Sequence, residues 1–239
     1  MELWKHPIEN QLNLIFPPRC PMCGELLCHG EHICSRCINE TEFICHPICR
    51  QCGRPWGRCR CGTESSPFFF TRNISPLIYS KAARSGIHRM KFHNSPSSCT
   101  YFGKLMALAV RTEYLDAGIP IDCVMGVPMY CDDERRRGYN QANLLAKIVA
   151  SELNLPCFSR VLTKYRKNEN QHTLSYAERQ KNIRNVFRVA HPKKITDKTV
   201  LLCDDVITSG STLNECARIL LEAGAGAVYC VTATTAVQS

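Results

Sequence analysis

The sequence lacks an apolar run long enough to cross a membrane. Residues 223–237 carry no charge, but Gly and Thr interrupt them and they fall short of the roughly 20 residues that a spanning helix needs. Residues 1–16 lack the apolar segment and cleavage site of a secretion signal. With 44% hydrophobic and 21% charged residues, disordered and collagen-like classes are excluded. We therefore expect a globular protein of the cytoplasm.

Acidic residues are scarce relative to basic ones, and the imbalance is local. The 239 residues hold 30 Lys+Arg against 21 Asp+Glu, a formal net charge of +9. Residues 1–66 are balanced, whereas residues 135–188 carry 12 basic and 3 acidic side chains. This concentration favours a nucleic acid or another phosphate-bearing partner over the alternative of a merely solvated basic face.

Cysteine, in contrast, is abundant. Of 17 cysteines, ten lie between Cys20 and Cys61. The other seven are single and mostly within apolar segments, so we expect them to be small core residues: Cys99, Cys123, Cys131, Cys157, Cys203, Cys216 and Cys230.

The clustered cysteines have the spacing of metal ligands. Pairs separated by two residues form tight turns whose sulfurs converge on one ion, and two pairs supply the four thiolates of a structural zinc. The first set predicts a zinc site. The second set leaves a second zinc open, because only one residue separates its last two cysteines. An iron–sulfur cluster is the alternative metal centre. The predicted ligands are Cys20, Cys23, Cys34 and Cys37, and then Cys49, Cys52, Cys59 and Cys61.

The end of the cysteine cluster suggests two domains, a cysteine-rich zinc-binding domain at 1–64 and an α/β domain at 65–239. Alternating patterns predict a parallel sheet with helices on both faces. The aromatic run 68–70 is interpreted as a buried strand that opens the second domain. Expected strands are a pair within 68–79 and single strands at 123–127, 158–162, 200–203 and 227–232; expected helices are 81–92, 101–115, 140–153 and 212–222.

Residues 200–212 form the most specific motif. An apolar strand leads into Asp204 and Asp205, a loop of small hydroxyl residues surrounds Gly210, and an amphipathic helix follows. Backbone N–H groups of such a loop and the helix N-terminus can hold a phosphate. The two carboxylates can accept hydrogen bonds from ribose hydroxyls or hold a hydrated magnesium ion. The motif therefore predicts a sugar phosphate ligand.

This segment resembles the phosphoribosyl pyrophosphate (PRPP) signature of type I phosphoribosyltransferases at each of its thirteen positions. Further motifs narrow the resemblance: 17–24, 49–55, 127–129, 135–142 and 174–182. Together they resemble the ComF (ComFC/GntX) family of competence proteins over nearly the whole chain. The resemblance implies an N-terminal zinc finger joined to a type I phosphoribosyltransferase-like domain.

The resemblance also implies roles for individual residues. The PRPP site, with magnesium, would comprise Asp204, Asp205, Val206, Ile207, Thr208, Ser209, Gly210, Ser211 and Thr212. The pyrophosphate loop would comprise Val127, Pro128 and Met129. Nucleic-acid or phosphate contacts would come from Lys91, Arg135, Arg136, Arg137, Tyr139, Asn140, Gln141 and Arg179. For residues 135–141, a loop that binds only pyrophosphate or caps the sheet is the alternative.

The function that the resemblance implies is a competence protein that assists the uptake of single-stranded transforming DNA. Its partners would be single-stranded DNA, PRPP and the inner-membrane DNA-uptake machinery, a helicase or recombination proteins, with a location in the cytoplasm or at the periphery of the inner membrane. Two alternatives stay open. One is a phosphoribosyltransferase acting on an unknown acceptor, and the other is a PRPP-responsive regulator.

Overall fold

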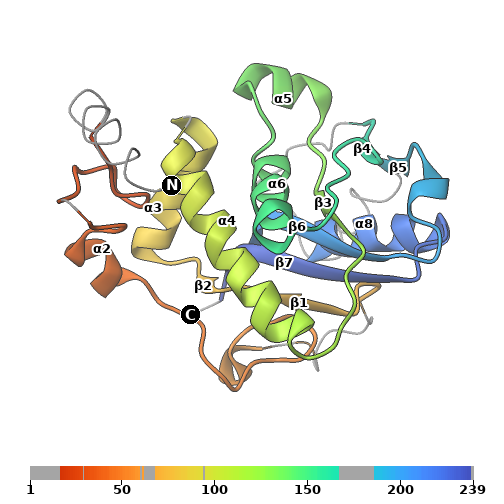
Figure 1. The fold of residues 1–239 in the computed structure, drawn as a ribbon, viewed down its shortest axis with the longest axis horizontal. Coiled ribbons are helices and arrows are strands. Elements are labelled where there is room, and N and C mark those ends of the chain that lie inside the picture. Colours follow the sequence, from red (N-terminus) through yellow and green to blue (C-terminus); the bar gives the residue numbers. More distant parts are fainter. Residues whose placement is uncertain are drawn as a thin grey trace, which may run out of the picture.

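The computed structural model describes residues 17–28, 30–59, 61, 68–93, 95–166 and 186–237. Their centre is a parallel sheet in the order β1–β7–β6–β3, with β2 also paired to β7 (Figure 1). The strands are β1 Arg72–Ile74, β2 Leu77–Ile78, β3 Cys123–Gly126, β6 Thr199–Ile207 and β7 Ala227–Thr235.

The sheet is buried on both faces because its central strands alternate between two cores. Leu201, Cys203 and Val231 enter one apolar cluster, whereas Leu202 and Cys230 enter the other. A strand covered on both sides reads as a continuous apolar run, which is how residues 200–203 read in the sequence.

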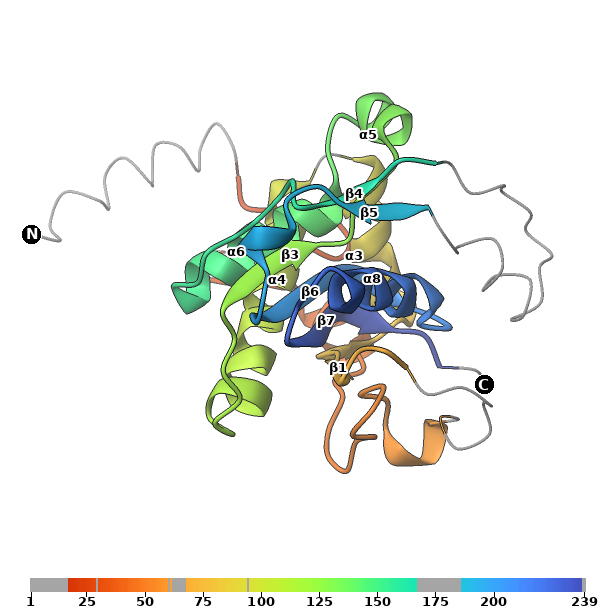
Figure 2. The ribbon, with the colours of Figure 1, turned by 90° about the vertical axis from the view of Figure 1, so that its right-hand side faces the viewer.

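Helices α3 Lys81–Phe92, α4 Pro96–Val110 and α6 Gln141–Leu153 pack in the first core, and α4 continues into the π-helical turn η2 Arg111–Leu115. The second core holds α8 Ser211–Glu222 and a separate antiparallel ribbon of β4 Leu162–Lys164 and β5 Phe187–Val189. Figure 2 shows α8 on the opposite side of the sheet from α4 and α6. The predicted α/β class, with helices on both faces of a parallel sheet, is confirmed.

Several predicted elements differ from the structure. The aromatic run 68–70 is not a strand; the rings of Phe68 and Phe70 stack 4.6 Å apart, and Phe70 fills the second core. The strand expected at 158–162 lies instead at Leu162–Lys164 and joins the ribbon, while the backbone near Cys157 makes only a single bridge to Val124. Both errors arise because apolar content predicts burial but not the partner that completes a strand.

Short helices were also missed. They are α2 Ser35–Glu40, η1 Trp56–Arg58, α5 Cys131–Arg137 and η3 Pro192–Lys194. Cys131 is exposed at the start of α5, which corrects its prediction as a core residue. The predicted domain boundary at 64/65 and the motif 174–182 lie outside the described residues.

No helix within the described ranges is both long and apolar enough to cross a membrane.

Candidate metal centres and phosphate site

Both cysteine sets converge in space. In each set the four sulfur atoms lie within 4.8 Å of one another. The Sγ atoms of Cys23 and Cys34 are 3.7 Å apart, and those of Cys52 and Cys59 are 3.6 Å apart. A tetrahedral zinc with bonds of about 2.3 Å separates its sulfurs by about 3.8 Å. The donor type and spacing fit zinc in both sets, including the tighter Cys59 and Cys61 pair.

In each set the turn favours the thiolate form of one cysteine, whereas burial raises the pKa of Cys37, Cys52 and Cys61. Burial raises the pKa of Cys20 and of Cys49, but hydrogen bonds to the sulfurs, mainly from the backbone of the turns, outweigh it and lower each pKa to about 7. The N–H of Gln51 donates to Cys49 Sγ at 3.4 Å, and that of Cys61 donates to Cys59 Sγ at 3.3 Å. Such donors stabilise the thiolate form that binds the metal.

The first set is part of a hydrophobic core. Cys20, Cys37 and Met22 are buried in the cluster that contains α3 and α4. Ser98 of α4 donates its hydroxyl to the carbonyl of Pro21 at 2.6 Å. At Gly86 of α3, an added Cβ would lie 2.8 Å from Met22 Sδ, so the knuckle lies directly against the helix.

The second set contacts the sheet and the phosphate loop instead. Asn73 of β1 donates its backbone N–H to Gln51 and its side-chain amide to Cys52. Gly53, in the left-handed region at φ +72°, approaches the Asn73 carbonyl so closely that a Cβ would lie 2.5 Å from it. Arg54 donates to the carbonyl of Ala236 at 3.0 Å and to that of Thr208, the first residue of the loop after β6.

The loop between β6 and α8, residues 208–210, leads directly into the helix. Gly210 takes a left-handed conformation at φ +79° and precedes the first turn of α8. The hydroxyls of Ser209 and Ser211 are 2.8 Å apart. A small cavity of ≈ 30 Å³ is lined by Asp204, Val206, Ile207, Thr208, Ser209, Gly210, Ser211, Thr212 and Leu213.

The acidic pair beside this loop is surrounded by donors. Asp205 is buried, accepts a hydrogen bond from Gln141 Nε2 at 2.8 Å and pairs with Lys91 Nζ at 3.1 Å. Burial and the charge of Asp205 raise the pKa of Asp204 to about 7, although Lys91 and Lys164 oppose this shift. Burial lowers the pKa of Lys164. The site thus holds two carboxylates and two lysines from separate elements.

Two clefts adjoin the acidic pair and share Met129 and Tyr139. The first, of ≈ 610 Å³, lies between α3 and α5 and is lined by Lys91, Phe92, Met129, Asp133, Arg136, Arg137 and Tyr139. The second, of ≈ 490 Å³, lies between α5, α6 and β4 and includes Pro128, Asn140, Lys147, Arg160 and Lys164 among its lining residues. Most residues predicted for pyrophosphate and nucleic acid therefore lie in or beside these clefts.

Other predicted residues have structural contacts or lie outside the clefts. Asn140 lines the second cleft but is buried and caps α6, accepting from Ala142 N at 2.9 Å while its amide donates to the Val127 carbonyl at 3.0 Å. Val127 is buried as well, so its side chain faces the core. Arg135 is exposed on α5 outside both clefts, and Arg179 lies outside the described residues.

Helix α5 contains as much negative as positive charge. Arg135 pairs with Asp132 at 3.3 Å, and Arg136 pairs with Asp133. Arg137 donates to Gln141 Oε1 at 2.6 Å and lies 5.5 Å from the centre of the Phe92 ring. Opposite charges three residues apart can be read from the sequence, but they predict ion pairs only if the segment is known to be helical.

Sequence reasoning missed two residues of the site, Lys164 and Arg54. Lys164 is the last residue of β4, a strand that was predicted at 158–162, and no motif marked it. Arg54 belongs to a recognised cysteine motif, yet its contact to Thr208 joins residues 154 positions apart, which no local pattern can indicate.

Comparisons with known proteins agree with this architecture. Residues 11–66 match the double zinc ribbon domain family, and residues 140–238 match the phosphoribosyl transferase domain family. The chain is 31% identical over 224 residues to the DNA utilization protein YhgH of Escherichia coli K12, covering 90% of this chain and 96% of that protein.

Two competence proteins are similar over comparable lengths. Identity to Competence protein F of Haemophilus influenzae is 30% over 213 residues, 86% of this chain and 92% of that protein. Identity to Competence protein ComFC of Bacillus subtilis is 26% over 210 residues, 84% of this chain and 83% of that protein.

A double zinc ribbon followed by a phosphoribosyltransferase-type α/β domain defines the class of protein, and the two tetra-cysteine sets support zinc rather than an iron–sulfur cluster. Within that class, the chain belongs to the ComF family of competence proteins, which its similarity to YhgH, Competence protein F and ComFC establishes.

Proposed function

We propose that this protein is a competence factor that assists the entry of single-stranded transforming DNA into the cytoplasm, and that it binds both single-stranded DNA and PRPP. The names of its relatives support a competence role. Membrane DNA-uptake proteins, a helicase or recombination proteins would then be its partners.

One observation carries the proposal. Lys91 lines the cleft between α3 and α5 and at the same time pairs with Asp205 at 3.1 Å. A lysine that borders both sites connects the cationic cleft, where a DNA phosphate would bind, to the acidic pair that would receive the ribose of PRPP. The neighbouring Arg137 and the exposed ring of Phe92 add a positive charge and a stacking face.

At the acidic pair, Asp204 and Asp205 would accept hydrogen bonds from the ribose hydroxyls, and the loop from Thr208 to Thr212 would hold the 5-phosphate. Magnesium would accompany the pyrophosphate and supply positive charge. Because the pKa of Asp204 is about 7, its carboxylate form increases as the pH rises through 7. PRPP binding with magnesium is therefore expected to strengthen from pH 6 to pH 8.

The test is fluorescence anisotropy of a labelled single-stranded oligonucleotide against the zinc-loaded protein, over a range of salt, with and without magnesium and PRPP. If about five phosphates are neutralised, log affinity falls with log salt at a slope of about −3.5. Lys91→Gln and Arg137→Gln are expected to weaken binding, whereas Lys104→Gln, an exposed change on α4, serves as the control. Binding that is absent or insensitive to salt would contradict the proposal.

A phosphoribosyltransferase activity is the second candidate, favoured by Asp204, a carboxyl group that exchanges its proton near neutral pH beside Lys164. Incubation with PRPP, magnesium and a panel of nucleobases, with pyrophosphate release as the readout, tests it. Pyrophosphate release that is abolished in Asp204→Asn would support an enzyme. No pyrophosphate release with any nucleobase would count against one.

A further inference from the structure

The cations on and beside the β4–β5 ribbon differ from Arg135 and Arg136 of α5 in their ion pairing. The arginines Arg135 and Arg136 of α5 are paired with carboxylates of their own helix. Within the described ranges, no carboxylate lies within ion-pair distance of the cations on or beside the ribbon, which are Arg160, Lys164, Arg166, Arg188, Lys193 and Lys194. An approaching polyanion would therefore meet these side chains without displacing a protein carboxylate.

Aromatic rings are interleaved with these cations. Tyr165 is 40% exposed, and the guanidinium carbons of Arg166 and Arg188 lie 5.4 Å and 5.9 Å from the centre of its ring. Beside the ribbon, Lys194 Nζ lies 5.9 Å from the centre of the Phe158 ring. Exposed rings beside cations are what single-stranded nucleic acid uses, because bases stack on rings and guanidinium planes while phosphates contact the charges.

The register of the ribbon explains how distant residues gather there. Thr163 pairs with Arg188 and Lys164 pairs with Phe187, and the N–H of Tyr165 donates to the Val186 carbonyl at 2.9 Å. Phe187 is buried in the second core and anchors β5 there, whereas the next residue, Arg188, is exposed. The ribbon is thus a fixed support for exposed side chains.

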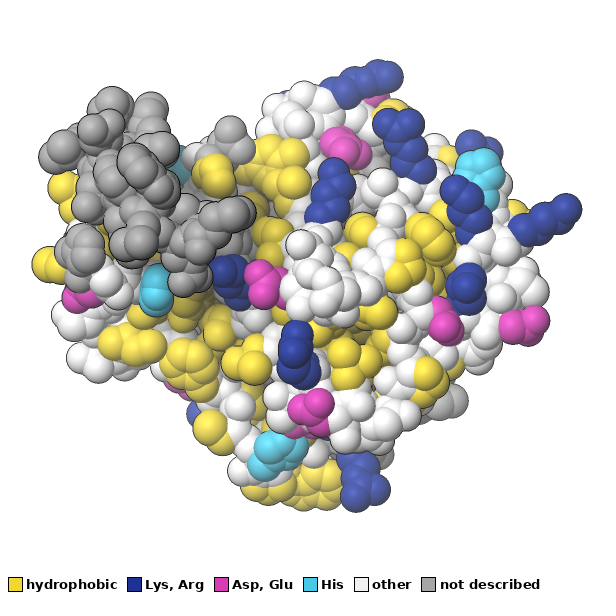
Figure 3. All heavy atoms as spheres, in the orientation of Figure 1, with side chains coloured by type: hydrophobic (Ala, Val, Ile, Leu, Met, Phe, Trp, Pro, Cys, Tyr) yellow, Lys and Arg dark blue, Asp and Glu magenta, His cyan; other side chains and the backbone are white. Residues whose placement is uncertain are grey.

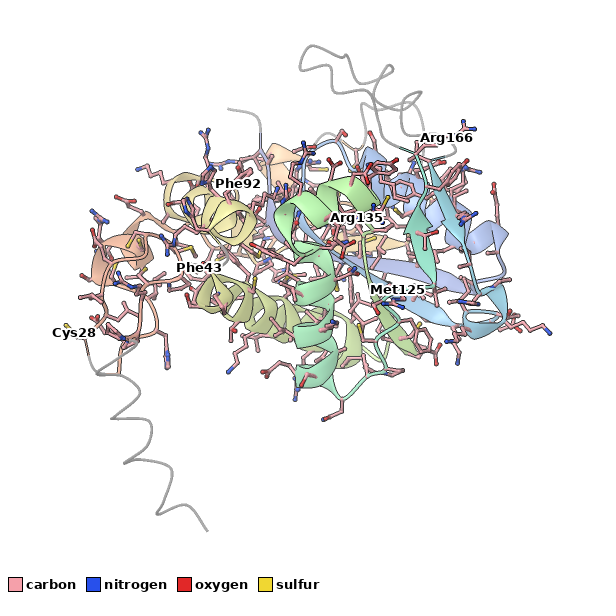
Figure 4. The ribbon with its side chains drawn as sticks, turned by 90° about the horizontal axis from the view of Figure 1, so that it is seen from above. Cys28, Phe43, Phe92, Met125, Arg135 and Arg166 are labelled. Atoms are coloured by element: carbon pink, nitrogen blue, oxygen red, sulfur yellow. The ribbon has the colours of Figure 1, made fainter. Side chains whose placement is uncertain are left out.

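The ribbon continues the clefts of the candidate site. The ≈ 490 Å³ cleft is lined on one side by Thr163 and Lys164 of β4 and shares Met129 and Tyr139 with the ≈ 610 Å³ cleft that contains Lys91. In Figure 3, Lys and Arg side chains gather on the right of the face, over the region of β5 and η3. Figure 4 shows Arg135 on α5 and Arg166 at the end of β4, so the helix and the ribbon lie at the same end of the sheet.

We propose that the β4–β5 ribbon is a second contact surface for single-stranded DNA, continuous with the cleft between α3 and α5. Bases stack on Tyr165 and its flanking guanidinium groups, and phosphates contact Arg188, Arg166 and Lys194. Stacking on rings and contacts to phosphates tolerate any base, so this surface is expected to bind without sequence preference. The inference rests on the DNA binding proposed above and extends the DNA contact surface from the cleft onto the ribbon.

The experiment compares two ribbon variants, Tyr165→Ala and the double variant Arg166→Gln/Arg188→Gln. The matched control is Arg84→Gln/Lys104→Gln, which removes the same charge from exposed positions on α3 and α4. Each zinc-loaded protein is titrated with oligothymidine of about 18 nucleotides and with an abasic oligomer of equal length, a length beyond one typical site of about 4–16 nucleotides. Circular dichroism, Tm and zinc content verify folding.

We expect Tyr165→Ala to weaken oligothymidine binding at least about fivefold and to leave the abasic oligomer unaffected, since only bases stack. Tyr165→Phe, which keeps the ring, should bind as the wild type does. The double arginine variant should weaken both oligomers and reduce the salt slope by about 1.4, the loss of two phosphate contacts.

Three outcomes overturn the inference. If the wild type binds DNA and both ribbon variants bind like the control, the ribbon is not a contact surface, while the proposed DNA binding stands. If Tyr165→Ala has no effect but the arginine variant weakens both oligomers, the ribbon attracts any polyanion and the stacking role is wrong. If the wild type binds neither oligomer, the proposed DNA binding fails together with this inference.

Discussion

The two cysteine sets have the same ligands but are attached to different parts of the molecule. The first lies in the core formed by α3 and α4, with Cys20 and Met22 fully buried there. The second is bound by hydrogen bonds to β1 and reaches the phosphate loop through Arg54. Figure 1 shows the two segments at separate places on the domain, one beside α3 and the other below β1. One metal chemistry thus supports packing in one place and a loop conformation in the other.

The largest expected effect comes from the first set. Replacing Cys20 and Cys23 by Ser removes one zinc and leaves polar groups in the core of α3 and α4. Because metal binding free energy is folding free energy, the free energy of unfolding should fall by at least about 3 kcal/mol, which lowers Tm by roughly 6–12 °C. Thermal unfolding monitored by circular dichroism measures this, and an unchanged Tm would show that the first set does not support the core.

The same substitution in the second set should separate stability from binding. Cys49→Ser/Cys52→Ser removes the zinc that holds the Arg54 turn. We expect PRPP affinity to fall about tenfold, about 1.4 kcal/mol, with a smaller loss of Tm than in the first set. Isothermal titration with PRPP and magnesium provides the measurement. Equal PRPP affinities for the two double variants would show that the second set has no particular effect on the phosphate loop.

A single arginine tests the connection without removing a metal. Arg54→Ala deletes the donors to the Thr208 and Ala236 carbonyls and should weaken PRPP binding by about threefold to tenfold, since one hydrogen bond from a charged group contributes about 1.5–3 kcal/mol before relaxation. Zinc content by atomic absorption should stay at the wild-type value. Arg58→Ala is the matched control, because the Arg58 side chain pairs with exposed Glu42 at 3.4 Å. A decrease of the same size in that variant would exclude a specific role for Arg54.

The smallest effect concerns pH, since Asp204 has a pKa of about 7. The folded-state pKa of Asp204 is raised from 3.8, so the folded protein retains a proton that the unfolded chain loses, and stability falls as pH rises from about 4 to about 7. Asp204→Asn should remove this loss and raise Tm at pH 8 by about 2–4 °C, the equivalent of about 1 kcal/mol. Tm measured from pH 5 to pH 8 checks it, and a slope that persists in the variant would assign the pH dependence to other groups.

The sequence predicted the parts of the molecule that are local in the chain. The cysteine spacing predicted the first metal set and left the second zinc open. The run from Val200 to Thr212 predicted the strand, the acidic pair and the loop, although β6 extends to Ile207 and contains the acidic pair. The periodicity of Ala142, Leu145 and Val149 likewise identified the buried face of α6.

What could not be predicted depends on partners far away in the chain. The strand near 158–162 is shifted because its partner is β5 and not the central sheet. The basic segment 135–188 appeared uniform, yet α5 neutralises its own arginines while the ribbon does not. The contacts of Lys91 to Asp205 and of Arg54 to Thr208 likewise arise only when the elements pack.

Lys91 gives the two candidate sites a common component, and thermodynamic linkage then constrains both. A magnesium-bound ligand at Asp205, as proposed, would compete with the Lys91 ammonium for the same carboxylate oxygen, and the displaced ammonium would be available to an anion in the neighbouring cleft. If a ligand at the acidic pair changes the affinity of the cleft for an anion by some factor, the anion must change the affinity for that ligand by the same factor. If Lys91 carries this coupling, the factor falls to 1 in both directions in Lys91→Gln.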